Sequence, residues 1–219
     1  MGWFSGADKD PRYVDRVWKT EEESYKGLAK AILIALKENR LPVIISFFPV
    51  DRQRVERFLS DLHVPLVSVA DETHAISRAA LVAYSFGGRD VLRWRSLQSL
   101  LQKEALSQQG LAVFFTTHNT DMSAEQELLK LFRGRKDNPV ELVFCLHLQS
   151  PLLRQFSANN ILDMMEKLGM KDDDFVEHPL VTSAINRARQ KIAKQVLVGK
   201  NADSEKEWFD KNVGPGQPN

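Results

Sequence analysis

Short apolar runs alternate with amphipathic segments along most of this chain, and this alternation restricts the fold more strongly than any other feature. The run PVIISFF at residues 42–48 is continuous and rich in β-branched side chains, which is typical of a strand buried on both faces. Further strands are predicted at residues 64–70, 80–85, 111–117 and 140–148. Because short links and helical segments separate them, we predict an α/β fold with a parallel sheet covered by helices on both faces.

The segments between the strands carry helix signals. Thr20 and Glu23 have the spacing of a capping box, which predicts a helix over residues 21–38. Asp51 is expected to cap the next helix, and Ser123 with Gln126 forms a second capping box. Beyond residue 150 the pattern is helical only, and a long helix is expected to begin at Pro179. Two further helices are predicted at residues 71–79 and 91–106.

These patterns divide the chain into four parts. Residues 1–19 contain glycines, a proline and several charges, and are expected to form a mobile or loosely packed arm. Residues 20–156 form the α/β domain, and residues 157–198 add helices. Residues 199–219 end in VGPGQPN and are predicted to be disordered.

Composition argues against several classes of protein. Lys and Arg total 30 against 29 for Asp and Glu, so bulk charge gives no support for nucleic-acid or membrane binding. With one cysteine, Cys145, an internal disulfide and a cysteine metal cluster are impossible, and the histidines lack metal-ligand spacing. No apolar run has the length of a membrane span, and the N-terminus lacks a secretory signal pattern. We therefore expect a cytoplasmic protein without a metal site.

Several stretches resemble the SecA preprotein translocase ATPase family. The words MMEKLGM, EHPLVTSAI and RARQKI, all within residues 164–192, match the point where that family's second nucleotide-binding domain passes into its long scaffold helix. A weaker resemblance begins at VWKTEEESYKGLAKAI and continues through PVIISFFPVDRQRVERFL. The resemblance implies a RecA-like, helicase C-terminal-like domain with a truncated helical scaffold after it.

The phosphate-side motifs of the family are eroded in this chain. Where the family has AGRGTDI, this sequence has Gly87, Gly88 and Arg89 followed by Asp-Val. The arginine-finger segment becomes KLFRGRKDNPV, which contains Arg133 and Arg135. Counting back from the strand at 140–148 places Arg135 on the last arginine of the family motif, whereas counting forward places both arginines on its first RGR. Either register makes these five residues the candidate phosphate-binding site.

An arginine finger cannot hydrolyse ATP alone, because it only stabilises charge on a phosphate that another element holds. The phosphate loop G-x-x-x-x-G-K-[ST] does not occur in these 219 residues. We therefore expect no catalytic residue and no ATPase activity, which makes the chain a pseudo-ATPase. ATP with Mg²⁺ remains conceivable as a ligand only together with a partner domain.

Three functions are consistent with these features. The preferred one is a non-catalytic, SecA-like component that binds or regulates another protein, either a translocase component or motor fragment or a second copy of itself. The alternatives are half of a split ATP-dependent translocase and a module that senses a small phosphate. In the preferred case the last long helix presents an apolar face that needs a partner, a dimer mate or the chain's own arm; its residues are Ile185, Ala188, Ile192 and Val196.

Overall fold

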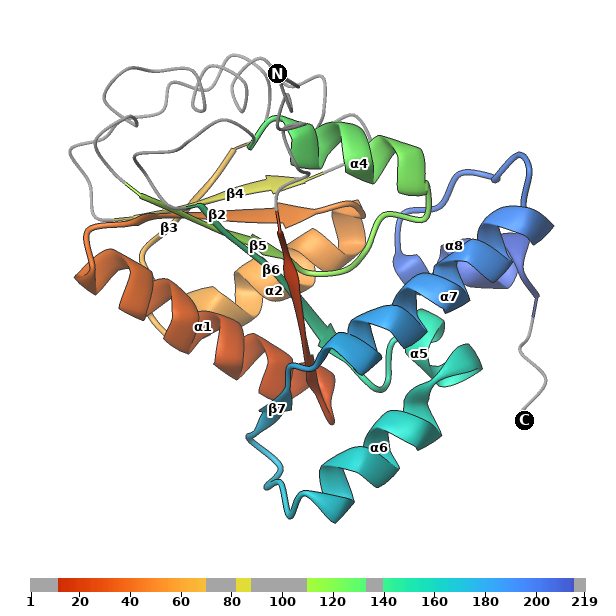
Figure 1. The fold of residues 1–219 in the computed structure, drawn as a ribbon. Helices are drawn as coiled ribbons and strands as arrows, with labels where there is room; N and C mark the ends of the chain where they lie inside the picture. The colour runs from red at the N-terminus through yellow and green to blue at the C-terminus, as the bar shows by residue number, and fades with distance from the viewer. Residues whose placement is uncertain (1–11, 70–81, 88–109, 133–139, 215–219) are drawn as a thin grey trace, which may run out of the picture.

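A computed structural model describes residues 12–69, 82–87, 110–132 and 140–214 of the 219-residue chain (Figure 1). Its centre is a seven-stranded sheet in the order β3-β4-β2-β5-β6-β1-β7. All neighbouring strands are parallel except β7, which runs antiparallel to β1 at one edge. The strands are β1 Val14–Trp18, β2 Leu41–Ser46, β3 Leu66–Ser68, β4 Ala83–Gly87, β5 Leu111–Phe115, β6 Val140–His147 and β7 Phe175–Val176.

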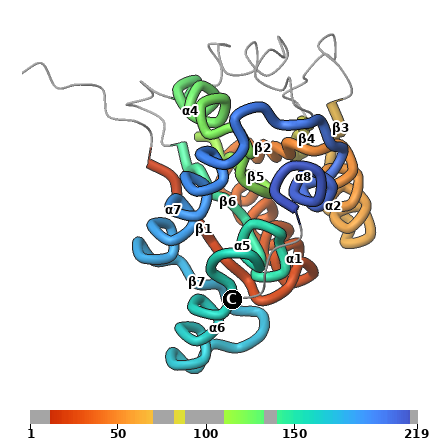
Figure 2. Tube along the Cα trace, turned by 90° about the vertical axis from the view of Figure 1, so that its right-hand side faces the viewer, coloured from red at the N-terminus to blue at the C-terminus, as the bar shows by residue number. Residues whose placement is uncertain are grey.

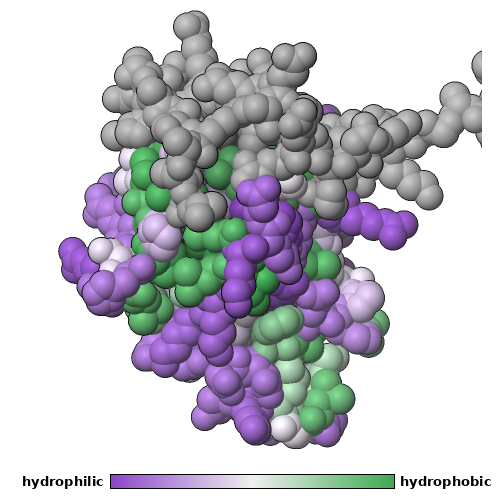
Figure 3. All heavy atoms as spheres, turned by 90° about the vertical axis from the view of Figure 1, so that its left-hand side faces the viewer, coloured by the Kyte–Doolittle hydropathy of each residue, from purple (hydrophilic) through white to green (hydrophobic). Residues whose placement is uncertain are grey.

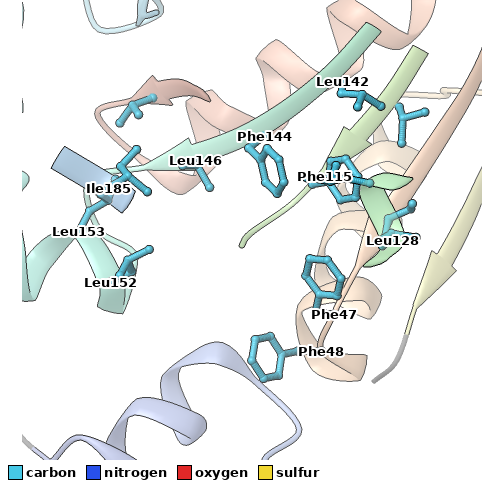
Figure 4. Close-up of a cluster of buried hydrophobic side chains, with 14 of the residues drawn as sticks. Phe47, Phe48, Phe115, Leu128, Leu142, Phe144, Leu146, Leu152, Leu153 and Ile185 are labelled. Atoms are coloured by element: carbon cyan, nitrogen blue, oxygen red, sulfur yellow. The ribbon is translucent and has the colours of Figure 1, made fainter. Parts of the chain in front are cut away.

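Helices cover both faces of the sheet (Figures 1 and 2). On one face, α1 and α2 pack over Ile44, Phe114 and Val143, whose side chains all point to that side. On the other face, α4, α5 and α7 pack over a core that includes Val43, Phe115 and Phe144 (Figure 4). The helices are α1 Glu21–Lys37, α2 Pro49–Asp61, α4 Met122–Lys130, α5 Pro151–Phe156, α6 Ala158–Lys167, α7 Pro179–Gln195 and α8 Glu205–Asn212.

The predicted α/β fold with a parallel sheet is confirmed, and the central strand is the clearest case. All six residues of β2 are buried, as its unbroken apolar run requires when both faces are covered. The Thr20 cap of α1 is also confirmed, because its hydroxyl accepts a hydrogen bond from the Glu23 N–H at 3.2 Å. The helices predicted at residues 71–79 and 91–106 lie outside the described residues.

Two predicted caps are wrong by a few residues. α4 is capped by Asp121, whose carboxylate accepts from the N–H groups of Ser123 and Ala124 at 2.9 and 3.2 Å. Ser123 therefore lies inside the first turn instead of preceding it. α2 begins at Pro49 after Phe48, so Asp51 belongs to its first turn. The Asp51 carboxylate instead accepts a hydrogen bond from α8, as described below.

The prediction that residues 1–19 form a loose arm is wrong for residues 14–18. These residues form β1, which lies between β6 and β7 inside the sheet. Asp15 and Arg16 interrupt the apolar pattern that would otherwise indicate a strand. Both charges are paired: Asp15 contacts His118 at 3.0 Å, and Arg16 forms an ion pair with Glu177 at 2.9 Å. Charges inside a strand are tolerated where the fold supplies their partners.

The prediction of disorder from residue 199 is wrong for the described part of that segment. Residues 205–212 form α8, and Trp208 and Phe209 are buried against the core. Ser204 caps the helix by accepting from the Glu207 N–H at 3.1 Å. The sequence contained this capping signal, because Glu207 follows Ser204 by three residues. Residues 215–219 lie outside the description.

The surface differs between the two edges of the sheet. Seen from the side where the parallel strands begin, hydrophilic side chains cover much of the described surface, and apolar ones gather in the middle (Figure 3). The opposite side, where the strands end, is covered by α5 and α8 (Figure 2). No helix within the described residues is both long and apolar enough to cross a membrane.

Gly27 on α1 gives a test of this packing. A Cβ at this position would lie 2.3 Å from the Trp18 ring, which is almost fully buried. Alanine normally stabilises a helix interior relative to glycine by about 1 kcal/mol. We expect Gly27→Ala to have the opposite sign and to lower the free energy of unfolding by roughly 1–3 kcal/mol. Chemical denaturation measures the change, with Lys30→Ala on the exposed side of α1 as a neutral control.

Candidate functional site

A cavity of about 480 Å³ lies at the edge where the parallel strands end, and we call it the carboxyl-edge cavity. Open parallel sheets bind their ligands at this edge. Thr116, Thr117 and His147 reach the cavity from the ends of β5 and β6, and Glu21 and Asp51 reach it from the first turns of α1 and α2. α8 covers the cavity and contributes Ser204, Glu205 and Lys206 (Figure 2).

Glu21 is held in an ionised state at one side of the cavity. Its Oε1 accepts hydrogen bonds from Arg54 at 2.8 Å and from the Tyr25 hydroxyl at 3.0 Å. Burial by itself would raise the pKa of Glu21, but these two bonds outweigh it and lower the pKa. Burial and the neighbouring carboxylate raise the pKa of Tyr25, which keeps its hydroxyl proton in place as a donor.

Two further carboxyl groups lie near each other where α8 meets α2: Asp51 belongs to α2 and Glu205 to α8. The backbone N–H of Glu205 donates to Asp51 Oδ2 at 2.8 Å, which joins α8 to α2. Burial raises the pKa of Asp51. Burial and the negative charge of Asp51 raise the pKa of Glu205 to about 8. The Glu205 carboxyl group is therefore mostly protonated near neutral pH and can donate a hydrogen bond.

His147 adds a neutral imidazole to the same cavity. Burial lowers the pKa of His147 to about 4, so the ring carries no charge at neutral pH. Its Nδ1 is buried and has no hydrogen-bond partner among the described residues. Such an atom can accept or donate one bond to a bound molecule, depending on the tautomer. The cavity thus offers hydrogen-bonding groups to a small polar ligand.

Most of the side chains that line the cavity are polar or charged. Within the described ranges, no group of three or more His, Cys, Asp or Glu side chains is arranged to hold a metal ion. Cys145 is buried mid-strand, and burial raises the pKa of its thiol to about 12, so it is not a nucleophile at neutral pH. Thr116 donates its hydroxyl proton to Ser46 at 2.9 Å.

A second polar cluster lies under α7, and we call it the His118 cluster: His118, Asp15, Glu125 and Arg189. His118 Nε2 is 3.0 Å from Asp15 Oδ1, and His118 Nδ1 is 3.1 Å from Glu125 Oε2. Arg189 of α7 forms an ion pair with Glu125 at 2.9 Å. All four side chains are buried, and the imidazole stacks on Phe144 with 4.0 Å between ring centroids.

The charges of the His118 cluster support one another. Burial would lower the pKa of His118, but the carboxylates of Glu125 and Asp15 outweigh it and raise the pKa. Burial would raise the pKa of Glu125, but His118 and Arg189 lower it. The histidine contribution to stability is lost as pH rises above 6.5 through the raised pKa, and the glutamate contribution is lost as pH falls below 4.5.

Four of the five predicted phosphate-binding residues, Gly88, Arg89, Arg133 and Arg135, lie outside the described residues. Gly87 is described, as the last residue of β4. A Cβ on Gly87 would lie 2.2 Å from Arg52 Cδ, so the glycine leaves room for that side chain. The Arg52 guanidinium donates to the carbonyl oxygens of Val69 and Ser85 at 3.0 and 3.2 Å, which ties α2 to β3 and β4.

The face of α7 that was predicted to bind a partner packs instead against the chain's own core. Ile185, Ala188 and Ile192 are buried in the chain's own core, and Val196 packs against the same core. Ile185 lies in the core that also contains Phe144 and Leu146 of the sheet (Figure 4). α8 adds Trp208 and Phe209 to the same core. The apolar period of α7 was read correctly, but the surface it needed is supplied by the chain's own sheet and α8.

The rule that open parallel sheets bind ligands where their strands end points to Asp51, Thr116 and Gln149, and these three residues line one cavity. Sequence reasoning missed other groups of this cavity. Glu205 was missed because its segment was taken as disordered. His147 was missed because a histidine at the end of an apolar run carries no spacing signal of its own.

Comparisons with known proteins place the chain beside one group. No family model matches the sequence. Protein translocase subunit SecA of Phocaeicola vulgatus is 26% identical over 190 residues, which cover 81% of this chain and 16% of that protein. SecA of Chloroherpeton thalassium is 25% identical over 83% of this chain and 18% of its own length, and SecA of Desulfotalea psychrophila is 25% identical over 82% and 22%.

The predicted relationship to SecA is thus confirmed over a part of that protein. The chain spans between 16% and 22% of the length of these relatives. The relationship links the chain to protein translocation, and it covers most of the described residues.

The His118 cluster predicts the effect of one substitution on stability. Arg189→Met removes one of the two cations of the cluster and leaves His118 alone to balance Glu125 and Asp15. We expect the free energy of unfolding to fall by about 3–5 kcal/mol, because removing one partner of a buried pair leaves an uncompensated charge. The matched control is Arg187→Met on the exposed side of α7. Equal stability of the two variants in urea would contradict the assigned role.

Proposed function

From its relationship to the SecA translocase subunit, we propose that this chain is a motor-domain protein that does not hydrolyse ATP and that binds a component of the protein translocation machinery. The observation that carries the proposal is the position of α8. This helix occupies the edge of the sheet where ligands of open α/β sheets bind. A nucleotide held between this domain and a separate motor domain would need the same edge.

The electrostatics of the carboxyl-edge cavity support the proposal. Glu21 is ionised beside the cavity, and Asp51 adds a second carboxyl group. A triphosphate placed there would meet these acidic side chains, while the lining cations Arg54 and Lys206 are paired with Glu21 and Asp210. A Walker-type phosphate loop, which supplies backbone N–H groups and a lysine, is absent from the 219 residues. Both features favour a domain that uses its fold for binding.

The partner is proposed to bind beyond the buried face of α7. Leu197 and Val198 follow that helix and are 88% and 90% exposed. They adjoin a groove of about 470 Å³ whose lining includes Phe47, Ile192 and Trp208. Two adjacent, almost fully exposed apolar side chains beside an aromatic-lined groove form a surface that a protein partner could bury.

ATP hydrolysis tests the catalytic half of the proposal. We expect the purified chain to release no phosphate above the buffer rate when it is incubated with ATP and Mg²⁺. The same assay repeated with a separately produced first motor domain of SecA tests the split-ATPase alternative. Turnover that appears in either assay and is abolished by Arg135→Ala would reject the non-catalytic function.

Binding to SecA tests the other half. We expect full-length SecA from the same cell to bind the immobilised chain. The double substitution Leu197→Ser, Val198→Ser should weaken this binding at least tenfold, because it removes the exposed apolar pair. Leu33→Ser on α1, which is 48% exposed, serves as the matched control. Interferometry measures both affinities, and a chain with no affinity for SecA would contradict the proposal.

A further inference from the structure

α8 is docked on the rest of the described chain by two buried aromatic side chains, Trp208 and Phe209, and by hydrogen bonds. Glu205 N–H donates to Asp51, Val50 N–H donates to the Asp203 carbonyl oxygen at 2.9 Å, and the Glu205 carboxyl group is hydrogen-bonded to Thr117 and to the backbone of Leu152. The link from α7 is exposed at residues 197–200. A helix of eight residues has marginal stability in isolation, so α8 exists as a helix mainly because it is docked.

Glu205 is the residue of α8 whose burial opposes docking. The residue is only 9% exposed, and it carries an ionisable group into the interior. Docking must either leave the carboxyl protonated or bury its negative charge, and the second state costs several kcal/mol. The free energy of docking therefore depends on whether Glu205 holds a proton.

Among the described residues, the charge of His118 lowers the pKa of Glu205, but burial and the charge of Asp51 outweigh it. His118 is held between Asp15 and Glu125, and Arg189 forms its ion pair with Glu125. On α2 the facing group is Asp51, whose charge repels that of Glu205. α5 contributes only hydrogen bonding through the backbone of Leu152, and Thr117 contributes its hydroxyl.

The other cations near α8 form ion pairs with different carboxylates or lie exposed at the rim of the cavity. Arg54 forms an ion pair with Glu21 at 2.8 Å. On α8 itself, Lys206 forms an ion pair with Asp210 at 2.7 Å. Arg154 of α5 is exposed at the rim of the cavity.

We propose that α8 is a proton-controlled lid over the carboxyl-edge cavity, which stays docked while Glu205 is protonated and releases when Glu205 ionises. Release uncovers the ends of β5 and β6, including Thr117 and the unpartnered Nδ1 of His147. The lid thus decides when the polar groups of the cavity become accessible to a ligand.

The sign of the pH dependence follows from the pKa of Glu205. Docking raises this pKa from its ordinary 4.5 to about 8, so the docked state holds the proton more tightly. The stability of the docked lid is complete below pH 4.5 and is lost as pH rises towards 8. The raised pKa of Asp51 acts in the same direction. The positive charge of His118 lowers the pKa of Glu205 and therefore weakens this dependence. His147, with its pKa lowered from 6.5 to about 4, acts in the opposite direction only below pH 6.5.

Hydrogen exchange of the full chain tests the lid directly. Amide protection of residues 206–213 is measured between pH 6.5 and 8 and corrected for the intrinsic exchange rate. We expect this protection to fall about tenfold or more across the interval, because the open state loses its proton and the docked state keeps it. Amides in the middle of α1 should keep their protection, since they report on the sheet and its helices.

Three variants decide whether Glu205 is responsible. Glu205→Gln should remove the pH dependence and keep the protection seen at low pH. Asp51→Asn removes the negative charge that repels an ionised Glu205, so it should lower the pKa of Glu205 in the docked state and weaken the pH dependence.

The measurable consequence of Asp51→Asn is a smaller fall in protection between pH 6.5 and 8. Without the negative charge of Asp51, an ionised Glu205 is less costly to keep under the lid, so the docked state gains less from holding the proton. Asp210→Asn, at an exposed acid of α8, is the matched control and should keep the full pH dependence of the native chain.

Two results would overturn the proposal. One is native protection of residues 206–213 that stays constant from pH 6.5 to 8. The other is a Glu205→Gln variant that loses protection with pH as the native chain does. If Glu205→Gln fails to fold, the comparison of Asp51→Asn with Asp210→Asn decides, and an equal pH dependence in these two variants rejects the lid.

Discussion

The buried charges of the His118 cluster are the constraint on which the arrangement of this domain depends. Asp15 lies on β1, Glu125 on α4 and Arg189 on α7, and His118 contacts both carboxylates from the segment after β5. None of these charges can be buried alone without a large cost in solvation. The cluster therefore requires β1 to lie inside the sheet and α7 to lie against it, and these two placements build the face on which α8 docks.

Periodicity predicted the elements whose residues all lie in one kind of environment. It failed where individual charged residues pair with partners that are distant in the sequence. β2 was predicted because six consecutive buried residues need an unbroken apolar run. β1 was not, because Asp15 and Arg16 look like solvent-exposed charges until His118 and Glu177 are placed beside them. The amphipathic face of α7 was evident, but periodicity does not say whether a chain's own sheet or another protein covers Ile185 and Ile192. Partners distant in sequence carry that information.

The candidate site shows the same division. The rule that ligands bind where parallel strands end points to the edge at which Asp51 and Thr116 line a cavity. The rule could not supply Glu205, which arrives from a segment some 150 residues beyond Asp51 and has its pKa raised by that contact. The protonation of the site thus depends on α8. The sequence contained the capping signal of this helix, Ser204 with Glu207, but the glycines and prolines that follow it favoured the prediction of disorder.

The end of α7 has a mechanical consequence. The helix stops at Gln195, and Val196 takes φ −111° and ψ 88°, so the chain turns back towards its own sheet. A long continuous helix acts as a stiff rod that can carry a displacement from one end of a machine to the other. Here the helix ends after 17 residues, and α8, which follows it, packs on the same core. A displacement of α7 would consequently be transmitted to α8 and to the sheet beneath both helices instead of to a distant point.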